Sequence, residues 1–242
     1  TNNTRLCIKA ETQKIGDRHD RRTTELKHQK AEQESNQRYR GMTDDDISDN
    51  ALHRYGLSAL DNIKTEHDQQ IIRYRFDING SVSISATAYN NEHQRDWFKT
   101  EGLDFDGSAS AESFSRTSWA KVVTAINENS NLGDYSTEDL QAILDGADTA
   151  AGSIQLRSNS REYFSRGVQL GLDWQFTRGE ASHEIEVGIR HHEDQEDRLQ
   201  RNSNYHQEGG RLILDDLGLL GNAGNRVQEA EALAIYIQDT IE

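Results

Sequence analysis

The sequence predicts an all-β fold, part of an antiparallel transmembrane β-barrel of about seven strands, with long extracellular loops that contain short helices. Hydrophobic residues make up only 33% of the 242 residues, against roughly 45–50% in an average domain, yet they gather in alternating runs of about ten residues. Short and long connections follow each other strictly, as in outer-membrane barrels. The sequence contains no long amphipathic helix to cover the apolar strand faces, so the expected cover is lipid.

Strict apolar alternation defines the strands. The expected strands are residues 4–12, 24–32, 70–78, 81–89, 161–176, 183–191 and 227–241. Asn79-Gly80 predicts a two-residue type I′ turn between the third and fourth strands. Short polar turns are also expected around Gly16 and at 177–182.

The other connections, about residues 33–68, 92–161 and 193–226, are much longer. Loops of this length count against a compact soluble domain unless they are functional. Within 92–161, Ser136 as N-cap, an acidic first turn and Gly146 as the stop predict a short helix. Residues 117–127 predict another. Both are interpreted as features of the loop, because neither is long enough to cover a sheet face.

The strand at 161–176 shows the pattern most clearly. Its even positions from Val168 to Phe176 are all apolar, and its odd positions are polar or glycine. From Tyr163 to Trp174 the strand would cover about 25 Å of bilayer, at roughly 3.3 Å per residue and a tilt near 45°. Tyr163 and Phe164 at one end, and Trp174 and Phe176 at the other, predict two aromatic girdles.

The neighbouring hairpin carries aromatic residues at its outer end, namely Tyr89, Trp97 and Phe98. The alternative interpretation places all these aromatic side chains in the core of a soluble β-sheet. That sheet would need a second layer over its apolar faces.

Composition and motifs exclude several classes of function. A formal charge of −15 argues against nucleic acid as a partner. The single cysteine, Cys7, excludes an intrachain disulfide. The sequence has no GxSxG, P-loop, HExxH or CxxC motif, so we expect neither an enzyme nor a cofactor. Residues 1–20 have no apolar signal-peptide region, and we expect any targeting signal upstream of them.

Two acidic stretches invite a metal interpretation. RHHEDQEDR, residues 190–198, is rich in metal-ligand residue types, but His191 and His192 point to opposite faces of a strand. Asp44, Asp45 and Asp46 lack the spacing and the glycine of an EF-hand loop. Both stretches are interpreted as solvated, and no dedicated metal site is expected.

Several stretches resemble a known family. RYGLSALDNIKTEHDQ (54–69), ATAYNNEHQRDWFK (86–99), NSREYFSRGVQLGL (159–172), EVGIRHHEDQEDR (186–198) and the loop entry RGMTDDDI (40–47) resemble TonB-dependent outer-membrane receptors, in particular the ferric-citrate (iron dicitrate) receptor-like branch. The resemblance implies a barrel of about 22 strands in the bacterial outer membrane, closed by an N-terminal plug domain. It also implies import of a ferric chelate, such as a siderophore or iron citrate, with energy relayed by TonB.

The sequence departs from that family's pattern. It contains no TonB box, no plug and no closing C-terminal strand that ends in an aromatic residue. Residues 1–242 are therefore expected to form an internal fragment of the barrel, with the TonB-interacting region and the plug supplied from elsewhere. Such a fragment would not transport on its own. A passive porin or adhesin barrel, or a soluble β-rich binding domain, are the alternatives.

If the ligand is an anionic ferric chelate, guanidinium groups near the outer mouth are the best candidates to bind its carboxylates. The candidate ligand-binding residues are Arg95, Trp97, Arg161, Arg190 and His192. In the alternative interpretation the arginines pair with loop carboxylates, and Gln169 and Arg190 contact the plug.

Overall fold

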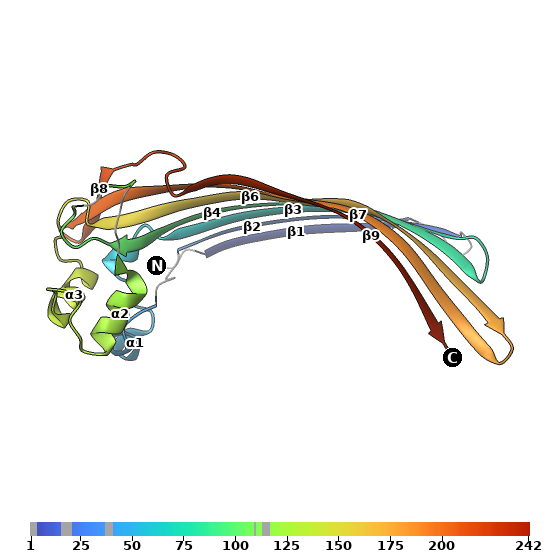
Figure 1. The fold of residues 1–242 in the computed structure, drawn as a ribbon, viewed down its shortest axis with the longest axis horizontal. Coiled ribbons are helices and arrows are strands. Elements are labelled where there is room, and N and C mark those ends of the chain that lie inside the picture. The colour runs from blue at the N-terminus through green and yellow to red at the C-terminus, as the bar shows by residue number, and fades with distance from the viewer. Residues whose placement is uncertain (1–3, 16–20, 37–40, 109, 113–116) are drawn as a thin grey trace.

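One antiparallel sheet forms nearly the whole molecule. The computed structural model describes residues 4–15, 21–36, 41–108, 110–112 and 117–242, and the side chains from residue 21 onward. The sheet order is β1-β2-β3-β4-β6-β7, and β7 then pairs with both β8 and β9. The sheet curves strongly, and all helices lie on its concave side at one end (Figure 1). We call this the loop end and the opposite end, with its hairpin turns, the turn end.

Seven long strands are present, as predicted. They are β1 (Thr4–Ile15), β2 (Arg22–Asn36), β3 (Asn62–Asp77), β4 (Val82–Leu103), β6 (Ile154–Arg178), β7 (Ala181–Glu208) and β9 (Gly224–Ile241), joined by the short β5 (Thr117–Ser118) and β8 (Arg211–Asp216). Most extend beyond their predicted bounds. At 25 residues, β6 spans about 60 Å at a 45° tilt, so it projects well beyond a bilayer.

The two hairpin turns described at the turn end differ from each other. At the first, Ile78 N–H donates to the Val82 carbonyl, and the Asn79 side chain accepts from the N–H groups of Ser81 and Val82. Neither Asn79 nor Gly80 has a positive φ, so the predicted type I′ turn is wrong. The side chain of Asn79 organises a longer turn instead. At the second, only Gly179 and Glu180 separate β6 from β7. The predicted turn around Gly16 lies outside the described residues.

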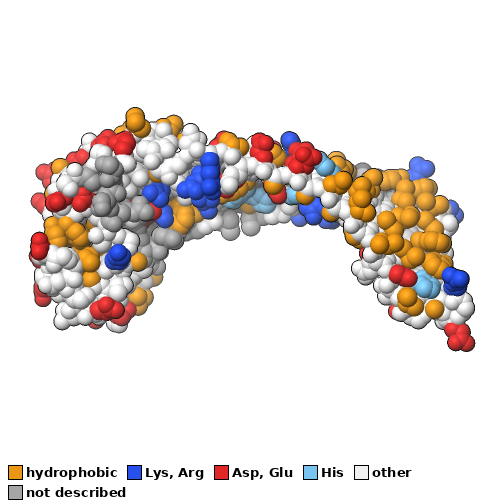
Figure 2. Space-filling view, in the orientation of Figure 1, with side chains coloured by type: hydrophobic (Ala, Val, Ile, Leu, Met, Phe, Trp, Pro, Cys, Tyr) orange, Lys and Arg blue, Asp and Glu red, His pale blue; other side chains and the backbone are white. Residues whose placement is uncertain are grey.

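The apolar strand faces are exposed. Val168, Leu170, Leu172 and Trp174 have exposed fractions of 51%, 53%, 37% and 45%, and no second sheet or helix in the described chain covers them. Cross-strand pairing continues this face into neighbouring strands. We call these side chains the apolar band: Leu26, Ile72, Tyr74, Phe76, Val82, Ile84, Ala86, Ala88, Val168, Leu170, Leu172, Trp174, Phe176, Ile185, Val187, Ile189, Leu233, Ile235, Ile237 and Ile241. Part of it is visible near the turn end in Figure 2.

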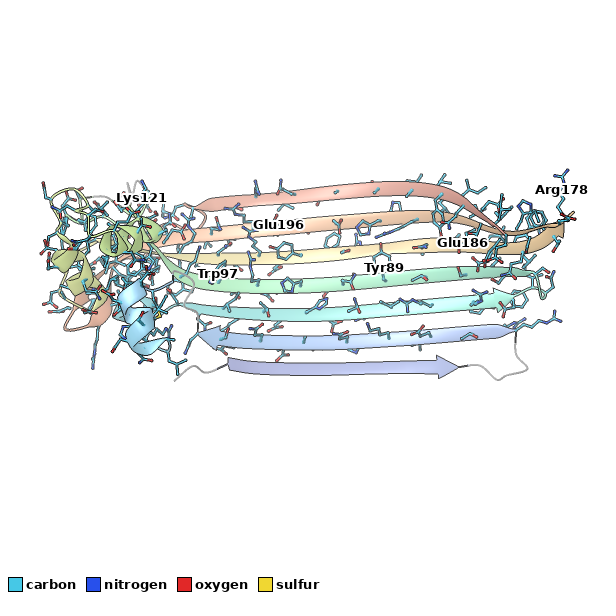
Figure 3. All side chains as sticks on the ribbon, turned by 90° about the horizontal axis from the view of Figure 1, so that it is seen from below. Tyr89, Trp97, Lys121, Arg178, Glu186 and Glu196 are labelled. Atoms are coloured by element: carbon cyan, nitrogen blue, oxygen red, sulfur yellow. The ribbon has the colours of Figure 1, made fainter. Side chains whose placement is uncertain are left out.

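The aromatic residues only partly follow the prediction. Trp174 and Phe176 pack together at the turn end, with ring centroids 4.6 Å apart. Phe164 lies on the same face at the loop-side limit of the apolar band, under the Arg166 guanidinium. Tyr163, however, lies on the concave face, because the strand period places it opposite Phe164. Tyr89 and Trp97 also lie on the concave face (Figure 3), so the second girdle is not formed as predicted.

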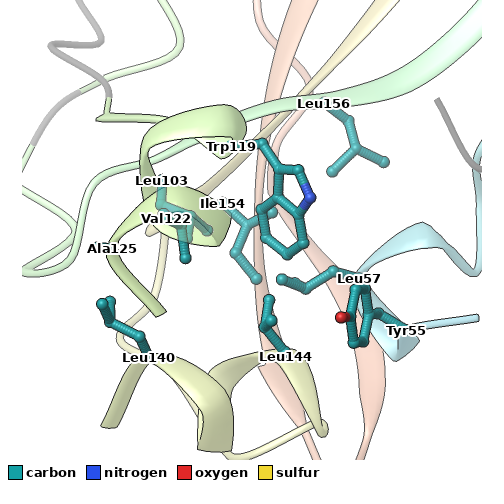
Figure 4. Close-up of a cluster of buried hydrophobic side chains, with 10 residues drawn as sticks. All are labelled: Tyr55, Leu57, Leu103, Trp119, Val122, Ala125, Leu140, Leu144, Ile154 and Leu156. Atoms are coloured by element: carbon teal, nitrogen blue, oxygen red, sulfur yellow. The ribbon is translucent and has the colours of Figure 1, made fainter. Parts of the chain in front are cut away.

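The hydrophobic core lies at the loop end, away from the apolar band. It is built where α2 (Trp119–Asn127) and α3 (Thr137–Leu144) meet the ends of β4 and β6 (Figure 4). Its members are Tyr55, Leu57, Leu103, Trp119, Val122, Ala125, Leu140, Leu144, Ile154 and Leu156. Both predicted helices are confirmed, including the Ser136 capping box. They lie within the long connection between β4 and β6, as predicted, and in addition they supply half of this core. No helix in the described residues is long and apolar enough to cross a membrane.

A further helix, α1 (Asp44–Asn50), uses the aspartates that we interpreted as a solvated loop. Thr43 is its N-cap and accepts from the Asp46 N–H. The short 3-10 helix η1 (Gly56–Ser58) follows Tyr55, whose hydroxyl donates to the Asp46 carboxylate at 2.6 Å. Burial alone would raise the pKa of Asp46, but hydrogen bonds from Tyr55, Thr43 and Gln141 outweigh it and hold this pKa below its usual value.

The Asp46 contact predicts a pH dependence for the loop-end core. Because its folded pKa is lowered, Asp46 stabilises the folded state above its unfolded pKa of about 3.9. This stabilisation is lost as pH falls through the lower folded value. We expect faster hydrogen exchange in α1 below about pH 4, and a smaller change in the Asp46→Asn variant. Asp45→Asn, on the exposed side of the same turn, is the control. Equal behaviour of both variants would contradict the prediction.

Candidate functional site

The concave face of the sheet carries a row of four arginines. Register places Arg95 of β4 opposite Arg161 of β6, Arg161 opposite Arg198 of β7, and Arg198 opposite Arg226 of β9. Directly paired residues of an antiparallel sheet share a face, and adjacent strands lie about 4.8 Å apart. These residues, called here the arginine row, therefore place four arginines in one register row across four adjacent strands of the concave face.

The surroundings of the arginine row leave it with excess positive charge. Arg161 pairs with Glu196 at 2.7 Å. Arg157 and Lys99, two rows nearer the loop end, share Glu101 at 3.0 and 3.3 Å. Among the ion pairs given for the described residues, Glu196 and Glu101 are the carboxylates that pair with this group of cations, in a chain whose formal net charge is −15.

Trp97 lies beside the arginine row on the concave face. Lys99 Nζ is 4.5 Å and Arg95 Cζ 5.8 Å from the centroid of its ring. These cation–π contacts place the two cations on one indole. Trp97 therefore orients the Arg95 end of the row and sits where its fluorescence can report on a ligand.

The convex face at the same height has the opposite charge. Register pairs Glu162 with Asp197, and Glu32 with Glu66, on this face. Like charges directly opposite each other are destabilising unless water or a partner screens them. Because successive residues of a strand alternate between faces, this row of carboxylates and the arginine row lie on opposite faces of the sheet.

A second polar group, the central cluster, lies nearer the turn end on the concave face. Arg190 Nη2 donates to the Tyr89 hydroxyl at 2.8 Å, and that hydroxyl also contacts His192 Nδ1. His192 Nε2 lies 2.7 Å from the Asp194 carboxylate. Gly167 makes the arrangement possible, because a Cβ there would collide with the Tyr89 hydroxyl.

The candidate ligand-binding residues therefore fall into two places. Arg95, Trp97 and Arg161 lie at the arginine row, whereas Arg190 and His192 belong to the central cluster. Arg190 is opposite Gln169, eight residues along β6 from Arg161, which is roughly 26 Å. A small chelate cannot touch both places at once.

The two histidines of RHHEDQEDR lie on opposite faces of β7, as predicted. His191 faces outward and pairs with Glu231 at 2.8 Å, while His192 faces the concave side. Among the residues that the structure describes, no three or more His, Cys, Asp or Glu side chains converge closely enough to hold a metal ion.

Arg198 and Arg226 were not among the sequence candidates. Arg198 is the last residue of RHHEDQEDR, where acidic neighbours dominate. Arg226 is predicted to lie in a loop, but the structure shows it near the start of β9. Only the register of β6, β7 and β9 brings them beside Arg161. The sequence signal that points to the arginine row is an arginine near the end of each of several strands.

The sheet can be compared with solved structures. The ferric citrate transporter FecA in its unliganded form superimposes with a TM-score of 0.62, at 14% identity, over 100% of this chain and 27% of that chain. The chain has the fold of part of an outer-membrane β-barrel. No family model matches the sequence. No curated protein shows significant similarity.

Two further barrel structures are similar. The open form of the ferric-catecholate import receptor Fiu from E. coli K12 gives a TM-score of 0.53, at 14% identity, over 99% of this chain and 39% of that one. BauA, the ferric preacinetobactin receptor from Acinetobacter baumannii, gives 0.53 at 8% identity, over 98% and 31%. The chain thus spans well under half the length of each of these barrel proteins.

Proposed function

We propose that this chain is part of the barrel wall of a bacterial outer-membrane receptor that imports an anionic ferric chelate. The arginine row is the observation that carries this proposal. A barrel wall alone would be compatible with a pore or an adhesin. Four arginines in one register row on the concave face are the property expected of a site for a multiply charged anion.

The chemistry of the row favours a carboxylate chelate such as iron citrate. Each guanidinium is a planar fork that binds a carboxylate through two parallel hydrogen bonds. Neighbouring arginines are one strand apart, about 4.8 Å, which suits carboxylates of a single small chelate. An uncharged hydroxamate chelate would offer the arginine row no negative charge.

The remaining parts of the proposal follow from the resemblance and from the fold. The apolar band would contact outer-membrane lipid. The central cluster, near mid-height of the concave face, would face a plug domain, and TonB would supply the energy for import. The chelate is cargo, so the receptor is neither an enzyme nor dependent on a cofactor.

Ferric citrate binding tests the proposal directly. The detergent-solubilised protein is titrated with ferric citrate and, as a control, with an uncharged ferric hydroxamate. The readout is quenching of Trp97 fluorescence, and a Trp97→Phe variant shows how much of the signal comes from that residue. We expect saturable quenching by ferric citrate alone, weakening as ionic strength rises. Equal binding of the uncharged chelate, independent of salt, would overturn the proposal. Binding without TonB-dependent uptake in cells would indicate a passive barrel.

A further inference from the structure

A second register row lies beside the arginine row, one step toward the turn end on the concave face. It brings His67 of β3 opposite His93 of β4, His93 opposite Tyr163 of β6, and Tyr163 opposite Glu196 of β7. We call His67 and His93 the histidine pair. The proposed binding of a chelate by arginines makes no use of these two imidazoles.

The histidine pair is in direct contact. The two ring centroids are 6.0 Å apart and the ring planes are nearly perpendicular, at 79°. On the other side of His93, the Tyr163 ring packs at 5.6 Å. A hollow of about 580 Å³ adjoins His93 and Tyr163, with Asn91, Asp194 and Glu196 also lining it. The His93 side of the pair is therefore open to small solutes.

We infer that the histidine pair forms a two-imidazole chelate for a divalent transition metal ion of the Zn²⁺, Ni²⁺ or Cu²⁺ type. Metal–nitrogen bonds of about 2.0–2.1 Å place the imidazole centroids about 5 Å apart in a tetrahedral site. The observed separation is about 1 Å larger, and small rotations of the two side chains close that gap. Imidazole ligands suit these metals.

Two protein ligands leave coordination positions open. This agrees with the finding that no larger His, Cys, Asp or Glu group converges in the described residues. Water completes the shell of the ion alone. Donor atoms of a bound solute in the adjoining hollow replace that water, as in sites that keep an exchangeable position.

Metal titration tests the inference without any chelate. The detergent-solubilised protein is titrated with Zn²⁺ in a buffer free of citrate, and Cu²⁺ loading is followed by electron paramagnetic resonance. We expect one saturable site, with a Cu²⁺ spectrum typical of two nitrogen ligands. The variant His67→Gln/His93→Gln should bind Zn²⁺ at least about tenfold more weakly, since even outer-shell changes cost 10–100-fold.

The controls separate this site from other histidines and from the chelate site. His191→Gln removes a histidine of the convex face and should leave the titration unchanged. Arg161→Gln should weaken ferric citrate while leaving Zn²⁺ bound, so the two proposals fail separately. If the double variant does not fold, the single variants H67Q and H93Q decide. Undiminished Zn²⁺ affinity in both singles, or in the double variant, would overturn the inference.

Discussion

Replacing Arg161 and Arg198 by glutamine should weaken ferric citrate binding by between about 10² and 10⁴-fold. Each replacement removes a charge-assisted hydrogen-bonding group that contributes about 1.5–3 kcal/mol, and 1.4 kcal/mol corresponds to a factor of ten in affinity. The two side chains occupy adjacent strands in the middle of the arginine row. The measurement is the dissociation constant for ferric citrate at constant ionic strength.

Arg166→Gln is the matched control for this prediction. Arg166 also belongs to β6, but its side chain is exposed on the convex face, where it pairs with Glu193. The overall charge therefore changes in the same direction, while the concave face keeps its four guanidinium groups. If Arg166→Gln weakened binding as much per charge as the concave substitutions, long-range attraction rather than a built site would explain the binding.

The second large effect concerns the apolar band. We expect Leu172→Arg to destabilise the protein in a bilayer by about 2–4 kcal/mol, the cost of a lipid-facing charge near the midplane. Leu172 lies in the central row of the band, between Ile84 and Val187 of the neighbouring strands. Urea unfolding from lipid vesicles, followed by tryptophan fluorescence, measures the change.

Gln175→Arg provides the comparison for Leu172→Arg. Gln175 lies three residues along the same strand but faces the concave side, where it donates to Glu184 at 3.0 Å. An arginine there meets a carboxylate and water, so its expected effect is within about 0.5 kcal/mol. Similar losses from both substitutions would contradict a lipid-facing role for the band.

Within the apolar band, sequence alone predicts the structure well. Between Val168 and Phe176 one face is apolar and the other polar, and this contrast determines both the strand and its orientation. Beyond Arg166 both faces are polar, so the alternation disappears although β6 and β7 continue as paired strands. For this reason the sequence predicts loops where the loop-end parts of β6 and β7 continue as strands.

The loop end and the candidate site required tertiary information. Thr117–Asn127 and Ser136–Gly146 contain local helix signals, but their shared contacts with Tyr55 and Leu57 are long-range. The arginine row depends on register, which is set by turn geometry and by cross-strand pairing. Arg95 and Arg161 are visible as strand-end arginines, whereas Arg226 joins them only because β9 starts three residues earlier than predicted.

The difference between the two faces of the sheet makes the strands sensitive to insertions and deletions. What matters is whether the number of residues gained or lost is odd or even. Because side chains alternate with a period of two, one extra residue within Val168–Phe176 would turn the lipid-facing set of the shifted segment toward the interior and expose its polar set to hydrocarbon. Two extra residues restore the alternation and change only the height at which side chains lie. Length changes that natural selection tolerates in β6 should therefore come in even numbers, whereas the loop end is free of this constraint.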